Sequence, residues 1–392
     1  MFKIKFKQTK NTFSSLLPWA FISDFAEGVV IQKDGLLQKT FVYRGPDLES
    51  SKALYVNDMC LYINDIIKSL GSGWAMQFET RRDITTSYLG ADFSNLAAYL
   101  IDKERENTYQ QYGRHYNSAY FLTIVYEPPT ETTNKLLHLF TTEKNGFEQN
   151  IKEAVEEIES ISNDIFEVLS KVMQIAPLDN EQTLNYLHSC ISFQPTVKLE
   201  EVFAPFYLDH VLPDETLINC NPLKLGEYYI PTLAIKTFPT ESYPAILDNL
   251  NAADCEYRWI TRFICMDKET AKKTIENTAA SWFGQRQSWR QALHKTLTNE
   301  DTGRENMAAV VQGNDTEEAR VGIERDEYSL GYFSTSIMVW DKDKVKARKK
   351  LTYVKGLLQS QGFSCCEENT NRMESYLSMQ PGNVYANLRR SI

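Results

Sequence analysis

The sequence lacks a hydrophobic run long enough to cross a membrane. The longest run near the start, residues 16–22, is far shorter than the roughly 18 residues that a spanning helix needs. No apolar stretch of signal-peptide length with a small-residue cleavage site is present either. The seven cysteines are odd in number and irregularly spaced, which is typical of reduced thiols and not of a disulfide framework. These absences predict a cytoplasmic protein.

The motifs of common catalytic and metal sites are also missing. No Gly-x-x-x-x-Gly-Lys-Ser/Thr phosphate loop occurs, and Gly71-Ser72-Gly73 lacks the lysine and leads into a predicted strand. None of the five histidines has another histidine four residues away, so a His-Glu-x-x-His zinc site is excluded. Cys365 and Cys366 are adjacent in a predicted strand and should point to opposite faces. We predict no catalytic, cofactor or metal residues in this chain; an active site assembled from distant residues is the alternative.

Charge and composition limit the class of protein further. Asp and Glu total 52 against 42 Lys and Arg, a net charge of −10, which disfavours a cationic nucleic-acid coat. A hydrophobic fraction of 42% excludes disorder as the main state, and 392 residues predict two or three domains or subdomains.

Hydrophobic periodicity predicts an α+β fold. Asp34-Gly35 between two apolar runs indicates a hairpin, and apolar residues spaced by three and four indicate a helix over 56–70. The order strand, helix, strand, helical insert, strand, helix, strand is predicted over 36–176 and again over 228–367. Each half therefore predicts a mainly antiparallel sheet with helices on one face, in a ferredoxin-like layout. The predicted regions are a docking segment at 1–25, subdomains at 26–194 and 226–380 (helical insert about 267–328), a Pro-containing connection at 195–225 and a lead-in at 381–392.

Three stretches are candidate contact sites. The basic and aromatic start of the chain favours docking to a membrane or a membrane protein, and a frayed terminus is the alternative. The candidate docking residues are Lys3, Lys5, Lys7, Trp19, Phe21 and Phe25. Trp282, Arg286 and Trp289 would share one helix face, which favours either an interface or the protein's own core. The basic run 342–350 is typical of a solvated helix face; a single-stranded DNA groove is the alternative, although no aromatic residues interleave with it.

Several short stretches, in their order and spacing, carry a resemblance to a known family. They are GVV at 28–30, KDG at 33–35, YRGPDL at 43–48, GSGW at 71–74, residues 120–129, YLHSC at 186–190, FPTES at 238–242, EYRWITRF at 256–263 and PGNVYANLRR at 381–390. The sequence resembles the N-terminal half of the TrbE/VirB4/CagE-type ATPases of type IV secretion and conjugation, with TrbE the nearest branch. The resemblance covers nearly the whole chain.

The resemblance implies a role in a larger machine. In that family a motor domain that binds ATP and Mg follows this region, and the chain ends at Ile392 before any such motif, so no ATP-binding residue can be transferred to it. The implied role is docking to the inner-membrane complex through a VirB3-type protein, at the cytoplasmic face of the bacterial inner membrane. The family also implies self-association as dimers or hexamers. Nucleic acid is not an expected partner.

Overall fold

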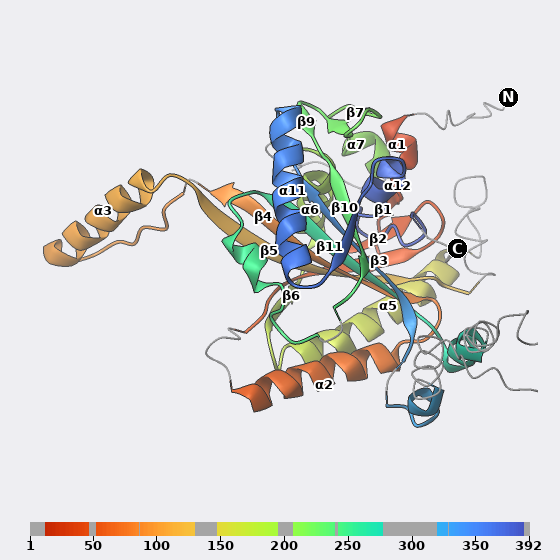
Figure 1. Cartoon of the computed structure of the whole chain (residues 1–392). Helices are drawn as coiled ribbons and strands as arrows, with labels where there is room; N and C mark the ends of the chain where they lie inside the picture. Colours follow the sequence, from red (N-terminus) through yellow and green to blue (C-terminus); the bar gives the residue numbers. More distant parts are fainter. Residues whose placement is uncertain are drawn as a thin grey trace, which may run out of the picture.

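The computed structural model (Figure 1) describes residues 12–46, 52–85, 87–129, 147–194, 207–239, 242–276, 320–327 and 329–387. Its centre is one ten-stranded sheet in the order β1-β2-β3-β5-β4-β11-β12-β10-β13, with β6 paired to β3. Across the described ranges, no helix is both long enough and apolar enough to span a bilayer.

The first half forms the predicted ferredoxin-like unit. Its elements follow the predicted order: β3 (Leu37–Arg44), α2 (Ala53–Ser69), β4 (Trp74–Thr85), an insert with α3 (Leu96–Gln111), β5 (His115–Tyr126), α5 (Phe147–Leu169) and β6 (Gln174–Pro177). The strands lie in the order β6-β3-β5-β4, and every neighbouring pair is antiparallel. The hairpin predicted at Asp34-Gly35 joins β2 (Val29–Gln32) to β3, and Gly35 supplies the positive φ of 86° at the turn.

The second half repeats the same strand order. It contains β10 (Thr232–Thr237), η1 (Asp248–Ala252), β11 (Tyr257–Cys265), β12 (Gly331–Val339), α11 (Lys344–Ser360) and β13 (Ser364–Glu367). The order β11-β12-β10-β13 is again antiparallel throughout. One detail differs from the prediction: the first helix of the predicted order is a short 3-10 helix here, η1. Within the predicted insert, residues 268–276 and 320–324 are helical, and 277–319 lie outside the described residues.

The two units share one sheet because their edge strands pair. β4 and β11 run antiparallel with an unbroken register, from Tyr257 opposite Arg82 to Ile264 opposite Ala75. The α+β class and ferredoxin-like layout are therefore confirmed, but the sheets predicted for the two subdomains are continuous. We call this β4–β11 junction the seam.

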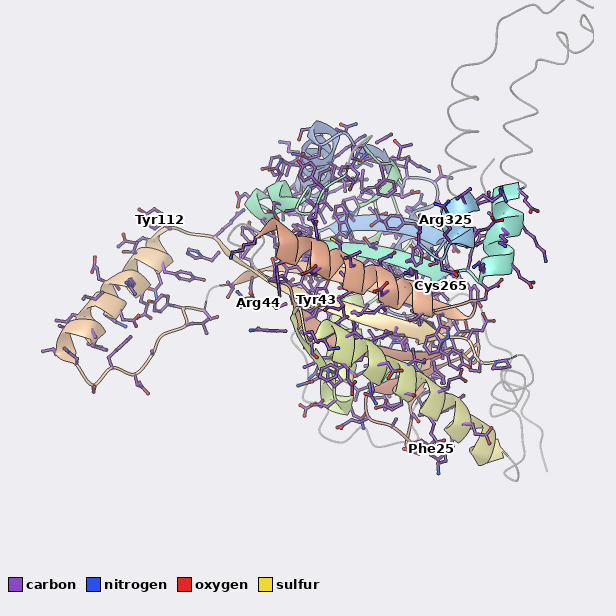
Figure 2. All side chains as sticks on the ribbon, turned by 90° about the horizontal axis from the view of Figure 1, so that it is seen from below. Phe25, Tyr43, Arg44, Tyr112, Cys265 and Arg325 are labelled. Carbon is purple, nitrogen blue, oxygen red and sulfur yellow. The ribbon has the colours of Figure 1, made fainter. Side chains whose placement is uncertain are left out.

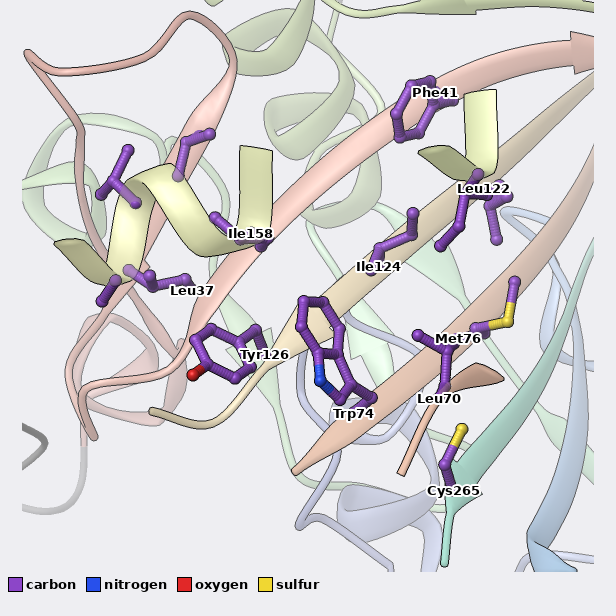
Figure 3. Packing of buried hydrophobic residues seen from close by; sticks show 14 of the residues in the cluster. Leu37, Phe41, Leu70, Trp74, Met76, Leu122, Ile124, Tyr126, Ile158 and Cys265 are labelled. Carbon is purple, nitrogen blue, oxygen red and sulfur yellow. The ribbon is translucent and has the colours of Figure 1, made fainter. Parts of the chain in front are cut away.

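One face of the sheet carries the main helices. On β4, Trp74, Met76 and Phe78 face α2 and α5 in the largest apolar cluster, a portion of which is drawn in Figure 3. Figure 2 looks onto this face, where α2 and α5 lie side by side. On β11, Trp259 lies opposite Thr80 and therefore points to the same face of the sheet. It packs with Leu351 and other residues of α11 in the second unit's cluster, so the helices of both units cover this face.

The opposite face is covered by shorter elements. They are α1 (Phe13–Leu16), α6 (Asn180–Ile191), α7 (Leu208–Val211), the small sheet β7 (Leu217–Ile218), β8 (Lys224–Leu225) and β9 (Tyr228–Tyr229), and α12 (Arg372–Leu377). The first strand of the main sheet, β1 (Trp19–Ile22), packs against α6 and α7. Because side chains alternate along a strand, this face receives Gln77 and Glu79 of β4 and Arg258 and Arg262 of β11. The sheet is thus apolar toward one layer and partly polar toward the other.

The insert with α3 projects from the body. β4 and β5 continue as a two-stranded ribbon to Thr85 opposite His115, beyond the last β11 partner at Arg82. Figures 1 and 2 both show α3 standing apart at the end of this ribbon, and Tyr112 lies where the helix returns toward the body. We call residues 83–119 the arm.

Candidate functional site

A fully buried ion pair crosses the seam. Arg258 of β11 and Glu79 of β4 expose 2% and 1% of their surface. Arg258 Nε donates to Glu79 Oε1 at 2.5 Å and Nη2 donates to Oε2 at 2.8 Å, which is the bidentate geometry that suits a guanidinium and a carboxylate. The hydroxyl of Tyr186, from α6, donates to the same Oε2 at 2.7 Å. The pair therefore ties the two units and α6 together at one point.

The electrostatics of this pair keep its arginine charged. Burial opposes the charge, but the Glu79 carboxylate, which accepts two hydrogen bonds from the guanidinium, outweighs it and holds the pKa of Arg258 well above its ordinary value. Burial also raises the pKa of the Cys190 thiol to about 12, so at neutral pH this sulfur is a protonated thiol and a poor nucleophile. The cluster of Glu79, Arg258, Tyr186 and Cys190 is therefore suited to holding β4, β11 and α6 together and not to covalent chemistry.

The guanidinium also holds a chain segment that has no regular secondary structure. Arg258 Nη2 donates to the carbonyl of Met379 at 2.7 Å. Residues 379–386, which we call the strap, run from there across the polar face of the sheet. A buried segment outside helices and strands must find donors for its carbonyl groups elsewhere.

Side chains of the sheet supply those donors in sequence. The carbonyls of residues 380, 381 and 382 accept from Gln77 (3.3 Å), from the Trp19 indole (2.8 Å) and from Gln32 (3.1 Å). Arg262 Nη1 then donates to the carbonyls of Asn383, Val384 and Ala386 at 2.8–3.0 Å. The strap is thereby fixed by side chains from β1, β2, β4 and β11.

Glycine is required where the strap lies closest to the sheet. Gly382 has a φ of +79°, which favours glycine, and its N–H donates to Gln77 Oε1 at 2.9 Å. A Cβ at this position would overlap the side-chain amides of Gln38 and Gln32. The Pro381-Gly382 pair within the predicted 381–392 stretch thus has a geometric reason.

This junction joins three of the stretches that carry the family resemblance. YLHSC at 186–190 supplies Tyr186 and Cys190, EYRWITRF at 256–263 supplies both arginines, and PGNVYANLRR at 381–390 supplies much of the strap. Any displacement of the strap is opposed by contacts to both units. The arrangement can hold the segment as one rigid body with the sheet.

The predicted contact residues differ in whether the structure describes them and in how exposed they are. Lys3, Lys5 and Lys7 lie outside the described residues, as do Trp282, Arg286 and Trp289. Trp19, a predicted docking residue, is instead fully buried: β1 pairs with β2, and the indole donates to the strap. Phe21 is partly buried against the first unit's core, whereas Phe25 is 46% exposed.

The basic run 342–350 covers the N-cap of α11, Asp343, and the first turns of the helix. Two of its charges are occupied: Lys342 pairs with Glu227 at 2.6 Å and Lys350 with Asp341 at 3.1 Å. Lys344, Lys346, Arg348 and Lys349 are exposed on the outer side of the helix. Tyr353 lies next to Arg348 and Lys349 around one shallow hollow, so an aromatic ring accompanies the run after all.

No role was predicted from the sequence for Glu79, Arg258, Arg262 or Gln77. A signal was present in the spacing along both strands: Gln77 and Glu79 are two residues apart on β4, and Arg258 and Arg262 are four apart on β11, so each pair lies on one face. Alternation alone predicts a face toward water. Only the position of the strap shows that these side chains face buried carbonyls.

Comparisons with known proteins agree along the chain. Residues 28–134 match the family model described as the N-terminal domain of the type IV secretion system ATPase VirB4/TrbE. Residues 167–286 and 282–389 match the model described as the CagE, TrbE, VirB family, a component of the type IV transporter system.

Individual relatives support the same picture. A conjugal transfer protein TrbE of Rhizobium radiobacter is 28% identical over 99% of this chain and 48% of its own length. A shorter, probable conjugal transfer protein TrbE of Sinorhizobium fredii is 31% identical over 34% of this chain and 93% of its own length. The type IV secretion system protein virB4 of Brucella abortus is 22% identical over 92% of this chain and 43% of its own length. The chain spans about half the length of the Rhizobium and Brucella relatives.

Proposed function

This chain belongs to the CagE, TrbE, VirB family of type IV transporter components, and from that premise we propose that it is the docking and assembly region of a VirB4/TrbE-type secretion ATPase. Such a region would anchor an ATP-driven motor to the inner-membrane complex during conjugative transfer and pilus assembly. ATP and Mg would bind to the motor and not to this chain.

The observation that carries the proposal is the strap junction, by which we mean the strap together with the side chains on both sides of the seam that donate to it. A docking region must transmit a displacement of one segment to the rest of its fold without deforming locally. The strap is bound to both units at once, through Arg258 and Arg262 on one side of the seam and Gln77 on the other. A segment held in this way would pass a displacement to the whole sheet.

The proposed partner is a VirB3-type inner-membrane protein, at the cytoplasmic face of the membrane. The basic start with Lys3, Lys5 and Lys7, and the exposed Phe25, are the candidate contacts. Self-association as a dimer or hexamer would belong to the longer protein. Trp19 is no longer a candidate, because its side chain is occupied inside the fold.

Co-expression with the VirB3-type protein of the same transfer system tests this proposal. The tagged chain is purified from a detergent extract, and the amount of partner retained is measured. We expect the wild-type chain to retain it and a variant with Lys3→Glu, Lys5→Glu and Lys7→Glu to lose it. A matched variant with Lys344→Glu, Lys346→Glu and Lys349→Glu makes the same charge change elsewhere and should retain it. No retention by the wild-type chain would contradict the docking role.

A second candidate function has one observation in its favour. The exposed cations of α11 lie beside the ring of Tyr353, and single-strand binding sites combine cations with a stacking surface. If α11 binds single-stranded DNA, the affinity should fall steeply as salt rises, because neutralised phosphates release counterions. Absence of binding to an oligonucleotide at low salt would exclude this candidate.

A further inference from the structure

The arm is a built structure and not an extended loop. Asn95 caps α3, since its Oδ1 accepts the N–H of Ala97 at 2.8 Å. Tyr109 stacks on His115 with ring centroids 3.4 Å apart, and Tyr88 donates to Asp102 at 2.8 Å. These contacts fix the helix against His115 of β5 and against Tyr88 in the segment that follows β4. The arm therefore presents its far end in a defined position.

The far end of the arm is apolar and exposed. Because Tyr112 lies on the body side, α3 begins at the end that is most distant from the sheet (Figure 2). Residues 93–101, which we call the tip, carry no charged side chain. Leu96, Leu100 and Ile101 are 72%, 58% and 58% exposed, and no residue of α3 is buried.

Every residue of 96–101 is aliphatic or aromatic, and the large side chains cover more than half of the helix circumference. At about 100° per residue, Leu100 lies roughly 40° and Ile101 roughly 140° from Leu96 in one direction, Tyr99 lies roughly 60° from it in the other, and Ala98 lies on the remaining side. A helix that docks in a protein groove carries its anchors along one stripe. An apolar surface on all sides instead suits a medium that encloses the tip.

The charge pattern points to a lipid surface as that medium. Residues 102–106 are Asp-Lys-Glu-Arg-Glu, a collar with both signs directly after the tip. The apolar turns of 96–101 are about 9 Å long at about 1.5 Å per residue, which matches the roughly 5–10 Å to which interfacial helices bury their apolar residues. With the tip at that depth, the collar would lie among headgroups that also carry both signs.

We infer that the tip of the arm inserts into the interfacial layer of a phospholipid bilayer, with residues 102–106 at the level of the headgroups. The inference extends the proposed docking role by adding a direct lipid contact. It differs from that role in both residues and partner, since the basic start and a membrane protein carry the other contact.

Flotation with protein-free vesicles tests the inference. The full chain is mixed with vesicles of phosphatidylcholine and phosphatidylethanolamine at high salt, so that the basic face of α11 contributes little. We expect the wild-type chain to float. The variant Leu96→Ser, Leu100→Ser, Ile101→Ser should show a partition coefficient lower by at least about tenfold, because most of the inserted apolar area is lost.

A matched variant separates the tip from exposed apolar residues in general. Leu61→Ser with Val345→Ser changes side chains that are 60% and 61% exposed on α2 and α11, and should float like the wild-type chain. Failure of the wild-type chain to float would overturn the inference and leave a protein socket as the tip's partner. Equal flotation of the tip variant would overturn it as well. The co-purification in detergent involves no bilayer, so either experiment can fail alone.

Discussion

The strap junction and the arm differ in which side chains they bury and which they expose. At the junction, charged and polar side chains are buried and bind main-chain carbonyls across the seam. On the arm, apolar side chains are exposed on a helix that contacts little of the body. Each region breaks the usual rule of apolar inside and polar outside.

The difference indicates that one region mainly affects the stability of the fold and the other mainly affects binding. Buried charges are tolerated only when their partners are in place, so removing one partner at the junction should lower the free energy of unfolding more than a substitution on the arm. Exposed apolar side chains contribute little to folding, so the arm should matter for binding alone. Substitutions in the two regions test this separation.

The largest expected loss comes from breaking the ion pair at the seam. Glu79→Gln leaves the guanidinium of Arg258 buried without its counterion, which should lower the free energy of unfolding by about 3–5 kcal/mol. Urea denaturation followed by circular dichroism measures it. Glu106→Gln, which removes the exposed pair with Lys103 on the arm, is the control and should leave the midpoint unchanged. Equal effects would contradict the comparison.

A smaller loss is expected when the strap loses Arg262. Arg262→Met leaves the carbonyls of Asn383, Val384 and Ala386 without their donor, at a cost of about 1–3 kcal/mol. Hydrogen exchange of peptides covering the strap should accelerate. Arg325→Met, at an arginine whose side chain is 71% exposed, should change neither quantity. Unchanged exchange in the Arg262 variant would show that the strap is held by other contacts.

Two glycine substitutions should have opposite signs. Gly382→Ala meets both a positive φ and the amides beneath the strap, and should destabilise by at least about 1–2 kcal/mol. Gly356→Ala lies on α11 with open space around it, and should stabilise by about 0.5–1 kcal/mol because alanine favours a helix. Thermal unfolding of the two variants measures the difference. The same sign for both would refute the strap geometry.

The smallest effect on stability is expected at the tip. Leu96→Ser, Leu100→Ser and Ile101→Ser together should shift the free energy of unfolding by less than about 0.5 kcal/mol per residue, since these side chains are largely exposed. Urea denaturation checks this value. A loss comparable to that of Glu79→Gln would mean that the tip packs on its own fold.

The local elements were predictable because their signals are local. The Asp34-Gly35 turn, the helix at 56–70 and the repeated element order all appear in the structure, and the ferredoxin-like layout follows from them. Element ends have local causes too: Asn95 caps α3, and β4 extends to Thr85 because β5 pairs with its polar end.

The candidate site was not predictable in the same way. The seam pairs strands about 180 residues apart, and no turn or periodicity specifies such a partner. Trp19 was interpreted as a contact residue because an aromatic side chain near a basic terminus is compatible with docking. In the structure its indole is buried and donates to the carbonyl of Pro381, 362 positions away. The roles of Arg258 and Arg262 likewise require knowing what covers the polar face.

The most direct test is hydrogen exchange during urea unfolding of the whole chain. Peptides from β5 report on the first unit and peptides from β12 on the second. If the seam and the strap make the two units one cooperative body, both sets lose protection at the same urea concentration. Two separate midpoints would contradict the account, because the units would then unfold independently of the ion pair and strap that join them.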